Sequence, residues 1–195
     1  MTRLKPLVIC SLAVLLSGCL VPERFTAAIK IDPDASYSYS YKGTAVHALA
    51  AAQIKKGKPL SSKEESGLKA EADKMSKLPD VTRATYVNEG RYKLELEGKK
   101  QPGERLKLLG FFEVSTASDG VITITSPDMK PRDLQGLQQL GIKIDGTLEV
   151  KLPKNAEIIS QNATSMPTFF GMWGAYTWKI GRLEQRPVMR IRLKK

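Results

Sequence analysis

The spacing of apolar residues along the chain predicts mostly β-strands. In residues 25–32 and 36–41 every second residue is apolar or aromatic, which places the three tyrosines of the second segment on one face of a strand. Turn-forming residues separate the two segments, so we expect a hairpin. Alternation of the same kind predicts further strands at residues 81–87, 92–97, 111–116, 121–125, 142–152 and 188–193.

Three other segments have the spacing of a helix. Residues 46–56 end before a glycine, residues 61–78 begin with serines that suit a helix cap, and residues 131–141 end at a glycine. This order of elements predicts an α+β fold, in which a mainly antiparallel β-sheet has two or three helices segregated on one side. No repeat and no shift in composition indicates a second domain.

The N-terminal segment has the pattern of an export signal. Arg3 and Lys5 precede the apolar residues 7–16, which are too few for the roughly 20 that a membrane-spanning helix needs. The run ends in Leu-Ser-Gly-Cys at residues 16–19, which resembles the lipobox of bacterial lipoproteins.

The lipobox resemblance implies that Cys19 receives a diacylglyceryl group and that the chain is cleaved between Gly18 and Cys19. We therefore expect residues 1–18 to be a signal peptide, residues 19–24 to be the acylated cysteine and a tether, and residues 25–195 to form one envelope domain. Acyl chains on Cys19 would hold that domain on a membrane.

The residue after the cysteine and the net charge bear on location and partner. The residue after Cys19 is Leu20 and not an aspartate, which by resemblance to other lipoproteins favours the outer membrane, facing the periplasm, in a cell with two membranes. In a cell with one membrane we expect the outer face of the plasma membrane. The chain has 31 Lys and Arg against 20 Asp and Glu, a formal charge of +11, and loss of Arg3 and Lys5 with the signal leaves +9. This charge favours an anionic lipid or acidic glycan as ligand, and nucleic acid is not expected in that compartment.

Few residues are available for catalysis or metal binding. His47 is the single histidine, and the two cysteines, Cys10 and Cys19, lie in or at the end of the expected signal, so the mature chain can form no internal disulfide. Nucleophilic sites that use a histidine base would all depend on His47, which lies in a predicted helix without a nearby carboxylate. We expect no enzyme, metal or cofactor, although a hydrolase with two carboxylates from distant strands stays an alternative.

The C-terminal strand is the first candidate binding site. It places Arg190, Arg192 and Lys194 on one face, and such a row of cations can bind phosphates, lipid headgroups or acidic glycans. The alternative is a solvated face that protects an edge strand against aggregation.

An aromatic segment at residues 166–178 is the second candidate. It forms either a flexible apolar loop that contacts a membrane, a ligand or a partner, or a cap over the end of the core. The aromatic residues proposed for contact are Phe169, Phe170, Trp173 and Tyr176.

The last third of the chain carries a family resemblance. Residues 146–153 follow the pattern G-x-L-x-V-x-L-P, Asn162 lies in the next loop, and Thr177-Trp178 falls in a later strand-like segment. This order is similar to the closing pattern of the LppM-like domain of bacterial lipoproteins. The resemblance implies an envelope domain, with lipid-headgroup binding as a candidate activity and no catalytic residues.

We therefore expect a membrane-anchored envelope lipoprotein that is not an enzyme and binds an anionic envelope component through its basic surface. The alternative is a structural or assembly subunit of an envelope protein complex, in which the aromatic segment and an open sheet edge contact other proteins.

Overall fold

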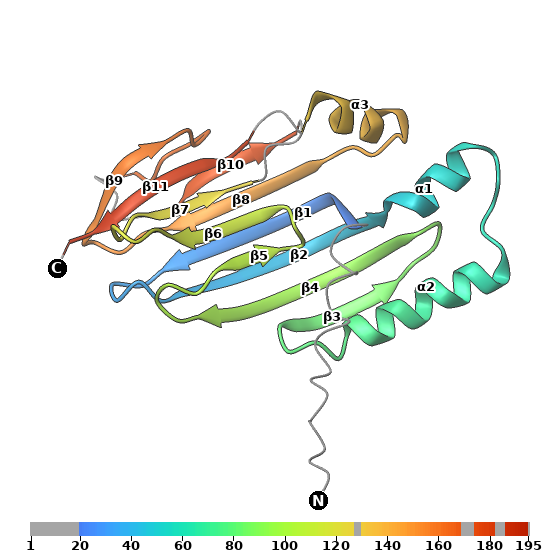
Figure 1. Ribbon diagram of the computed structural model, residues 1–195, viewed down its shortest axis with the longest axis horizontal. Helices are drawn as coiled ribbons and strands as arrows, with labels where there is room; N and C mark the ends of the chain where they lie inside the picture. Colours follow the sequence, from blue (N-terminus) through green and yellow to red (C-terminus); the bar gives the residue numbers. More distant parts are fainter. Residues whose placement is uncertain (1–19, 127–129, 169–173, 182–185, 195) are drawn as a thin grey trace, which may run out of the picture.

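The computed structural model describes residues 20–126, 130–168, 174–181 and 186–194, which form two β-sheets and three helices (Figure 1). The larger sheet has the strand order β10 (Tyr176–Ile180), β8 (Asp145–Lys151), β1 (Leu20–Ile31), β2 (Tyr37–His47), β4 (Arg91–Lys100) and β3 (Val81–Tyr86). The smaller sheet has the order β5 (Leu106–Leu108), β6 (Phe112–Thr116), β7 (Ile122–Thr125), β11 (Val188–Leu193) and β9 (Ala156–Gln161). The helices are α1 (Ala48–Lys55), α2 (Ser62–Met75) and α3 (Pro131–Gln139).

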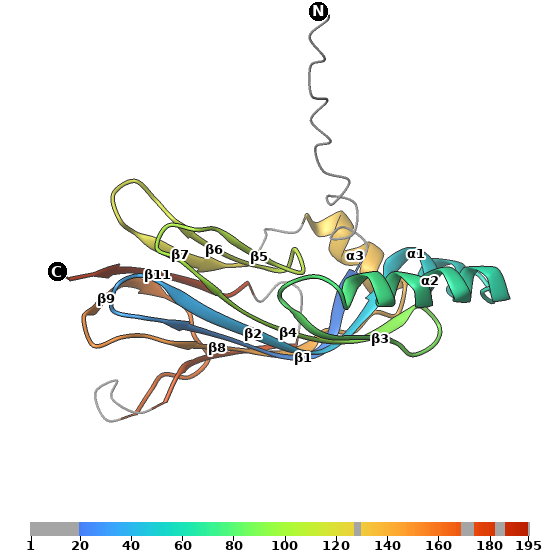
Figure 2. The ribbon, with the colours of Figure 1, turned by 90° about the horizontal axis from the view of Figure 1, so that it is seen from below.

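The layers explain why the fold is α+β. The smaller sheet covers one half of one face of the larger sheet, and the helices lie over the other half of that same face (Figure 2). Strands β1 and β8 pair in parallel, whereas the other described pairs are antiparallel. The predicted fold class is therefore confirmed, although the strands divide into two sheets.

The core lies between the layers, and the predicted tyrosine face of β2 is part of it. Tyr37, Tyr39 and Tyr41 are 2%, 4% and 1% exposed, while the serines between them point to the other face of the sheet. The rings exclude water and their hydroxyl groups still need partners, because a buried polar group without a hydrogen bond is costly. Tyr37 donates to the Glu104 carbonyl over 2.8 Å, and Tyr39 donates to Asp80 over 2.6 Å.

Phe25 occupies a position that two glycines leave open. Gly43 of β2 and Gly146 of β8 lie opposite it on the two neighbouring strands, and a Cβ on Gly146 would lie 2.2 Å from the Phe25 ring. The ring stacks on Tyr41 with centroids 5.5 Å apart and meets Phe112 edge-on at 5.7 Å. Each such pair adds about 0.5–1.5 kcal/mol beyond the burial of its area.

The expected tether at residues 20–24 is the first part of β1, which is a correction to the predicted boundary. Leu20 lies opposite His47 of β2 and is 7% exposed, so β1 already includes the first residue that the structure describes. A bulge between Pro22 and Phe25 interrupts the ladder, so the apolar residues of this part of β1 do not alternate regularly with those that follow.

Helix α1 starts later than residue 46 because β2 continues through His47. The His47 Nδ1 accepts a hydrogen bond from the Ala50 backbone N–H over 3.3 Å, so the histidine caps the helix. In α2 the predicted capping pattern is present, with Ser61 and Glu64 each accepting a backbone hydrogen bond from the other residue.

Candidate functional site

The face of the larger sheet that lies opposite the helices carries the residues of interest. Side chains alternate along a strand, so Ala28 and Lys30 of β1 point away from the core that contains Ile29 and Ile31, each 1% exposed. The strand register therefore decides which polar side chains become neighbours on this face.

Three lysines and one serine form a row across four strands, which we call the lysine row. Lys30 of β1 lies opposite Lys151 of β8 and Ser38 of β2, and Ser38 lies opposite Lys99 of β4. Since neighbouring strands lie about 4.8 Å apart, the row spans about 14 Å. It brings together side chains that lie far apart in the sequence.

The next row on the same face has small residues at its centre, and we call it the small-residue row. Ala28 lies opposite Glu149 and Ser40, and Ser40 lies opposite Glu97. Its two central side chains are short, so the surface sinks between the longer side chains around them. The residues of both rows line a concave site of about 400 Å³, which we call the sheet hollow.

The lysines of the sheet hollow differ in their partners. Lys30 is 3.1 Å from Asp32, whereas Lys99 and Lys151 form no ion pair with any described residue. The carboxylates of Glu97 and Glu149 lie in the adjacent row, beyond ion-pair distance of these lysines. The hollow therefore offers ammonium donors along one side and carboxylate acceptors at the ends of the other.

The predicted cation row on β11 exists, but two of its three members have carboxylate partners. Arg192 lies 3.5 Å from Asp119, and Lys194 lies 3.8 Å from Glu157. Arg190 is exposed, and no ion pair joins it to the described part of the chain. This β11 row belongs to the smaller sheet. Its Lys194 end lies near the turn that follows Lys30, because Asn155 Nδ2 donates to the carbonyls of both Lys194 and Pro33.

The predicted aromatic site is described only in part. Phe169, Phe170 and Trp173 lie outside the described residues. Tyr176 is half-buried in β10, lies opposite Val150 of β8 and packs against the core.

Asn162 connects the two sheets through side-chain hydrogen bonds. Its Oδ1 accepts from Trp178 Nε1 of β10 and from the Val188 N–H at the start of β11, both over 2.8 Å. Its Nδ2 donates to the Arg186 carbonyl over 2.8 Å. The residues of the predicted family pattern are therefore structural, since Asn162 and Trp178 bond each other and Gly146 makes room for Phe25.

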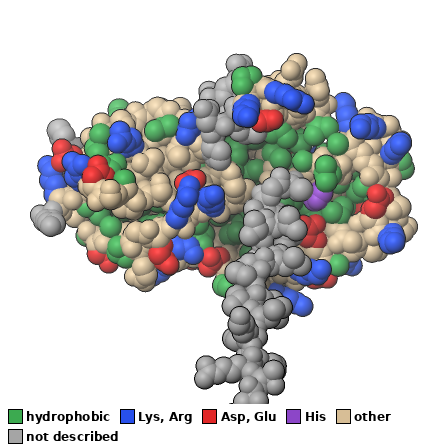
Figure 3. Space-filling model, in the orientation of Figure 1, with side chains coloured by type: hydrophobic (Ala, Val, Ile, Leu, Met, Phe, Trp, Pro, Cys, Tyr) green, Lys and Arg blue, Asp and Glu red, His purple; other side chains and the backbone are tan. Residues whose placement is uncertain are grey.

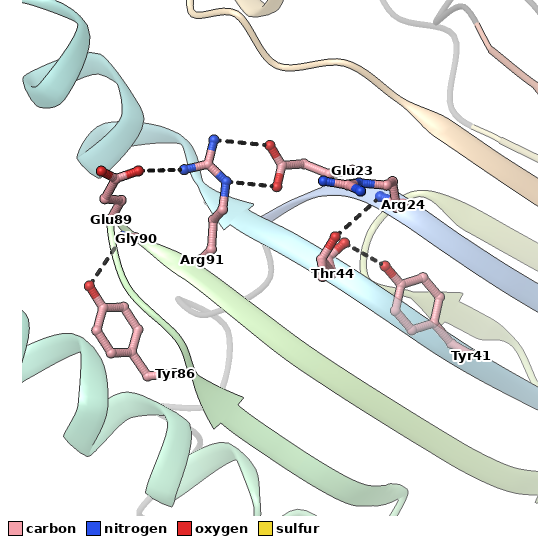
Figure 4. A network of polar contacts seen from close by, with 8 residues as sticks. All are labelled: Glu23, Arg24, Tyr41, Thr44, Tyr86, Glu89, Gly90 and Arg91. Carbon is pink, nitrogen blue, oxygen red and sulfur yellow. Dashed lines mark hydrogen bonds and ion pairs between the residues drawn. The ribbon is translucent and has the colours of Figure 1, made fainter.

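A polar network fastens the start of β1 at the helix end of the larger sheet (Figure 4). The Arg91 guanidinium of β4 contacts both Glu23 oxygens, over 3.1 and 3.4 Å, and reaches Glu89 over 3.3 Å. The Arg24 N–H donates to Thr44 Oγ1 over 3.3 Å. Because the Glu23 side chain is 13% exposed, this bidentate ion pair is better shielded from solvent than a surface ion pair.

The buried tyrosines serve as hydrogen-bond donors. Burial raises the pKa of Tyr37 to about 12, and burial together with the Asp80 hydrogen bond raises that of Tyr39. Both hydroxyl groups therefore stay protonated near neutral pH and hold the loops that contain Glu104 and Asp80.

The described residues lack two further features that would indicate a function, a metal-binding cluster and a membrane-spanning helix. They hold no group of three or more His, Cys, Asp or Glu side chains arranged to bind a metal ion. None of their helices has the length and apolar character required to cross a membrane.

Comparison with known proteins gives a similarity at the level of structure. No protein-family model and no curated protein sequence matches the chain. The chain is similar to the NMR structure of the folded domain of the Mycobacterium tuberculosis LppM protein, with a TM-score of 0.44 and 13% sequence identity. The match covers 89% of this chain and 91% of that chain.

Proposed function

We propose that this protein is an acyl-anchored envelope lipoprotein, not an enzyme, and that its sheet hollow binds an anionic, hydroxyl-rich envelope component. The lipobox at residues 16–19 and the acylation that it implies at Cys19 support the anchoring. The observation that carries the binding site is the lysine row along one side of a concave sheet surface.

The chemistry of the two rows fits a ligand with two kinds of group. Lysine ammonium groups bind phosphate or carboxylate, and Lys99 and Lys151 need not give up a carboxylate partner to do so. Glu97 and Glu149 accept hydrogen bonds from hydroxyl groups. Acidic glycans and sugar-phosphate headgroups of lipids share this combination of an anion and several hydroxyls.

The β11 row is the weaker candidate for the same chemistry. An anion that binds Arg192 or Lys194 competes with Asp119 or Glu157 for the same cation. The ion pairs that the anion forms with Arg192 or Lys194 replace ion pairs that already exist within the protein, so the net gain in binding free energy is small.

Two variants with the same loss of charge test this ranking. One changes Lys30, Lys99 and Lys151 to Ser, and the other changes Arg190, Arg192 and Lys194 to Ser. Binding of the acylated protein in detergent is measured by titration with a glucuronate-containing tetrasaccharide. Binding of unacylated residues 20–195 is measured separately, by flotation with vesicles of phosphatidylinositol in phosphatidylcholine.

We expect the variant with Lys30, Lys99 and Lys151 changed, the sheet-hollow variant, to bind about tenfold more weakly. Three lost contacts of about 0.5 kcal/mol each amount to about 1.5 kcal/mol, and about 1.4 kcal/mol corresponds to a tenfold change. The β11 variant should lose about twofold, through net charge alone. The probe that shows this difference identifies a glycan or a lipid headgroup as the ligand type. Equal losses for the two variants with both probes would contradict the proposed site.

A specific observation also supports a second candidate, an assembly subunit of an envelope complex. The edge strand β9 exposes two consecutive isoleucines, Ile158 at 40% and Ile159 at 44%, and Met166 nearby in the chain is 64% exposed. An edge strand with exposed apolar side chains can pair with another protein. Recovery of one stoichiometric partner by crosslinking in cells, lost with Ile159→Lys and retained in the sheet-hollow variant, would favour this function.

A further inference from the structure

We infer that the helix half of the domain lies on the membrane that holds the Cys19 acyl chains, with Leu49 inserted among the lipid headgroups. The inference rests on the proposed anchoring at Cys19, and adds to it an orientation and a second, direct contact with the bilayer. We call the contact surface the helix face; it consists of Leu49, Leu60 and Leu68 with Lys55, Lys56 and Lys58.

The centre of the helix face is apolar. Leu49 on α1 is 67% exposed, the largest exposed fraction among the large apolar side chains described. It borders a concave surface of about 270 Å³ between α1 and α2, to which Leu60 and Leu68 contribute. Glu64 also lines this surface, and its carboxylate accepts hydrogen bonds from Gln53 and Ser61. Figure 3 shows apolar side chains gathered over this half of the molecule, around the single histidine and between α1 and α3.

Cations border the apolar area on two sides. Lys55, Lys56 and Lys58 at the end of α1 are exposed and have no carboxylate within ion-pair distance among the residues described. Lys130 and Arg132 at the start of α3 are exposed as well, and Asp133 lies in the same turn. An apolar centre with a basic border is the pattern of surfaces that lie at the interface of an anionic bilayer.

The start of β1 places the acyl anchor beside this surface. Leu20 pairs with His47, and His47 is the cap of α1, two residues before Leu49. Cys19 is one residue from Leu20, and consecutive Cα atoms are 3.8 Å apart, so no tether can carry the acyl group to another side of the domain. The Arg91 contacts with Glu23 hold this segment in place.

The sheet hollow lies at the other end of the domain. Lys30 is ten residues along β1 from Leu20, which at about 3.3 Å per residue is about 33 Å. It also lies on the face of the larger sheet opposite the helices (Figure 2). A domain that rests on its helix face therefore turns the sheet hollow away from its own bilayer and toward the envelope space.

Variants of the acylated mature protein with one added cysteine test the orientation. The acylated mature chain has no free thiol by the lipobox resemblance, so Leu49→Cys and Ser40→Cys each give one site for an environment-sensitive fluorophore. Ser40 is an exposed residue of the small-residue row and serves as the matched control. Both proteins are reconstituted in vesicles of phosphatidylglycerol and phosphatidylcholine, with and without brominated acyl chains.

We expect the label at position 49 to shift to the blue in vesicles and to be quenched several-fold by brominated lipid, while the label at position 40 shows neither change. Changing Lys55, Lys56 and Lys58 to Ser should reduce the shift at position 49 on anionic vesicles, whereas changing Lys30, Lys99 and Lys151 to Ser should leave it unchanged.

The outcomes separate this inference from the proposed function. If the protein does not float with the vesicles at all, the acyl anchoring fails. If it floats but the labels at positions 49 and 40 are equally exposed to water, or equally immersed, only the orientation is overturned. A blue shift at position 49 that is already complete without lipid would point to a second copy of the chain on the helix face, and would also overturn the inference.

Discussion

The lysine row and the β11 row each contain three cations, but the chain builds them in different ways. The β11 row consists of alternate residues of one strand and is visible in the sequence. The lysine row takes one residue from each of four strands, and only the pairing of β8, β1, β2 and β4 makes them neighbours. A binding surface on a sheet is thus a property of strand register more than of any single strand.

The two rows also differ in what surrounds their charges. Asp119 and Glu157 neutralise part of the β11 row, whereas only Lys30 of the lysine row has a carboxylate partner in the described part of the chain. The number of cations is the same in both rows. The availability of those cations, and the concave shape of the surface, distinguish them.

The largest effect on stability is expected from a change that disturbs the pairing of β8 with β1, on which the lysine row depends. Gly146→Val places a side chain where the Phe25 ring lies, because even a Cβ at this position would be 2.2 Å from the ring. We expect the free energy of unfolding to fall by about 3 kcal/mol, as overpacking forces β8 away from β1. Urea unfolding followed by circular dichroism measures it.

Gly136→Ala is the matched control for that substitution. Gly136 lies within α3, and a Cβ there would meet no atom within 4 Å. Alanine should leave stability unchanged or raise it by up to about 1 kcal/mol, through its higher helix propensity. If Gly146→Val unfolds at the same urea concentration as Gly136→Ala, the proposed packing of Phe25 between β8 and β2 is wrong.

A smaller effect is expected at alkaline pH, where ionisation of the buried Tyr37 hydroxyl on one face of β2 lowers the free energy of unfolding. The pKa of Tyr37 is raised to about 12 from an unfolded value near 10, so its neutral form stabilises the fold. This contribution is complete below pH 10 and is lost as the pH rises through about 12. The free energy of unfolding should therefore decline over that range.

The Tyr37→Phe variant shows whether the buried face causes this decline. It should be about 1 kcal/mol less stable at neutral pH, because the Glu104 carbonyl loses its donor. Its stability should then fall less steeply than that of the unmodified protein between pH 10 and 12. Identical alkaline slopes would assign the decline to other groups.

The smallest effect is expected from releasing the cations of the β11 row. Asp119→Asn together with Glu157→Gln removes both carboxylate partners while keeping the side-chain shapes. Binding of a polyanion such as heparin should strengthen about twofold to threefold, and this gain should vanish at high salt. An unchanged affinity would mean that the partners of Arg192 and Lys194 do not limit this surface.

Much of the fold follows from local patterns. The alternation around the tyrosines of β2 predicted a hairpin with one buried face, and the capping residues Ser61 and Glu64 predicted the start of α2. Both features depend on residues close together in the chain. Two strands were missed for different reasons: β5 has three residues, and β9 places Ile158 and Ile159 side by side with both exposed. The strand β10 was indicated by the family pattern around Thr177-Trp178 and not by alternation.

The candidate site was not predictable in the same way. Lys30, Lys99 and Lys151 each look like an ordinary solvated lysine in the sequence, and nothing local reports that they share one row. Gly43 and Gly146 were a possible clue, since both lie opposite Phe25 and mark its neighbouring strands. Using this clue requires knowing that Phe25 lies opposite two glycines that are distant in the chain. A single sequence does not contain that information.

The position of Leu20 has a consequence for the order of events during maturation. β1 lies between β8 and β2 inside the larger sheet and begins one residue after Cys19, the cysteine at which the chain would be acylated and cleaved according to the lipobox resemblance. An enzyme that cleaves a chain needs several extended residues around the bond, including those after Cys19. Once β8 has paired with β1 and Leu20 is buried, that stretch is part of the folded domain. We therefore expect lipid attachment and cleavage to compete in time with folding, so that variants which fold faster than they are processed accumulate as the uncleaved precursor.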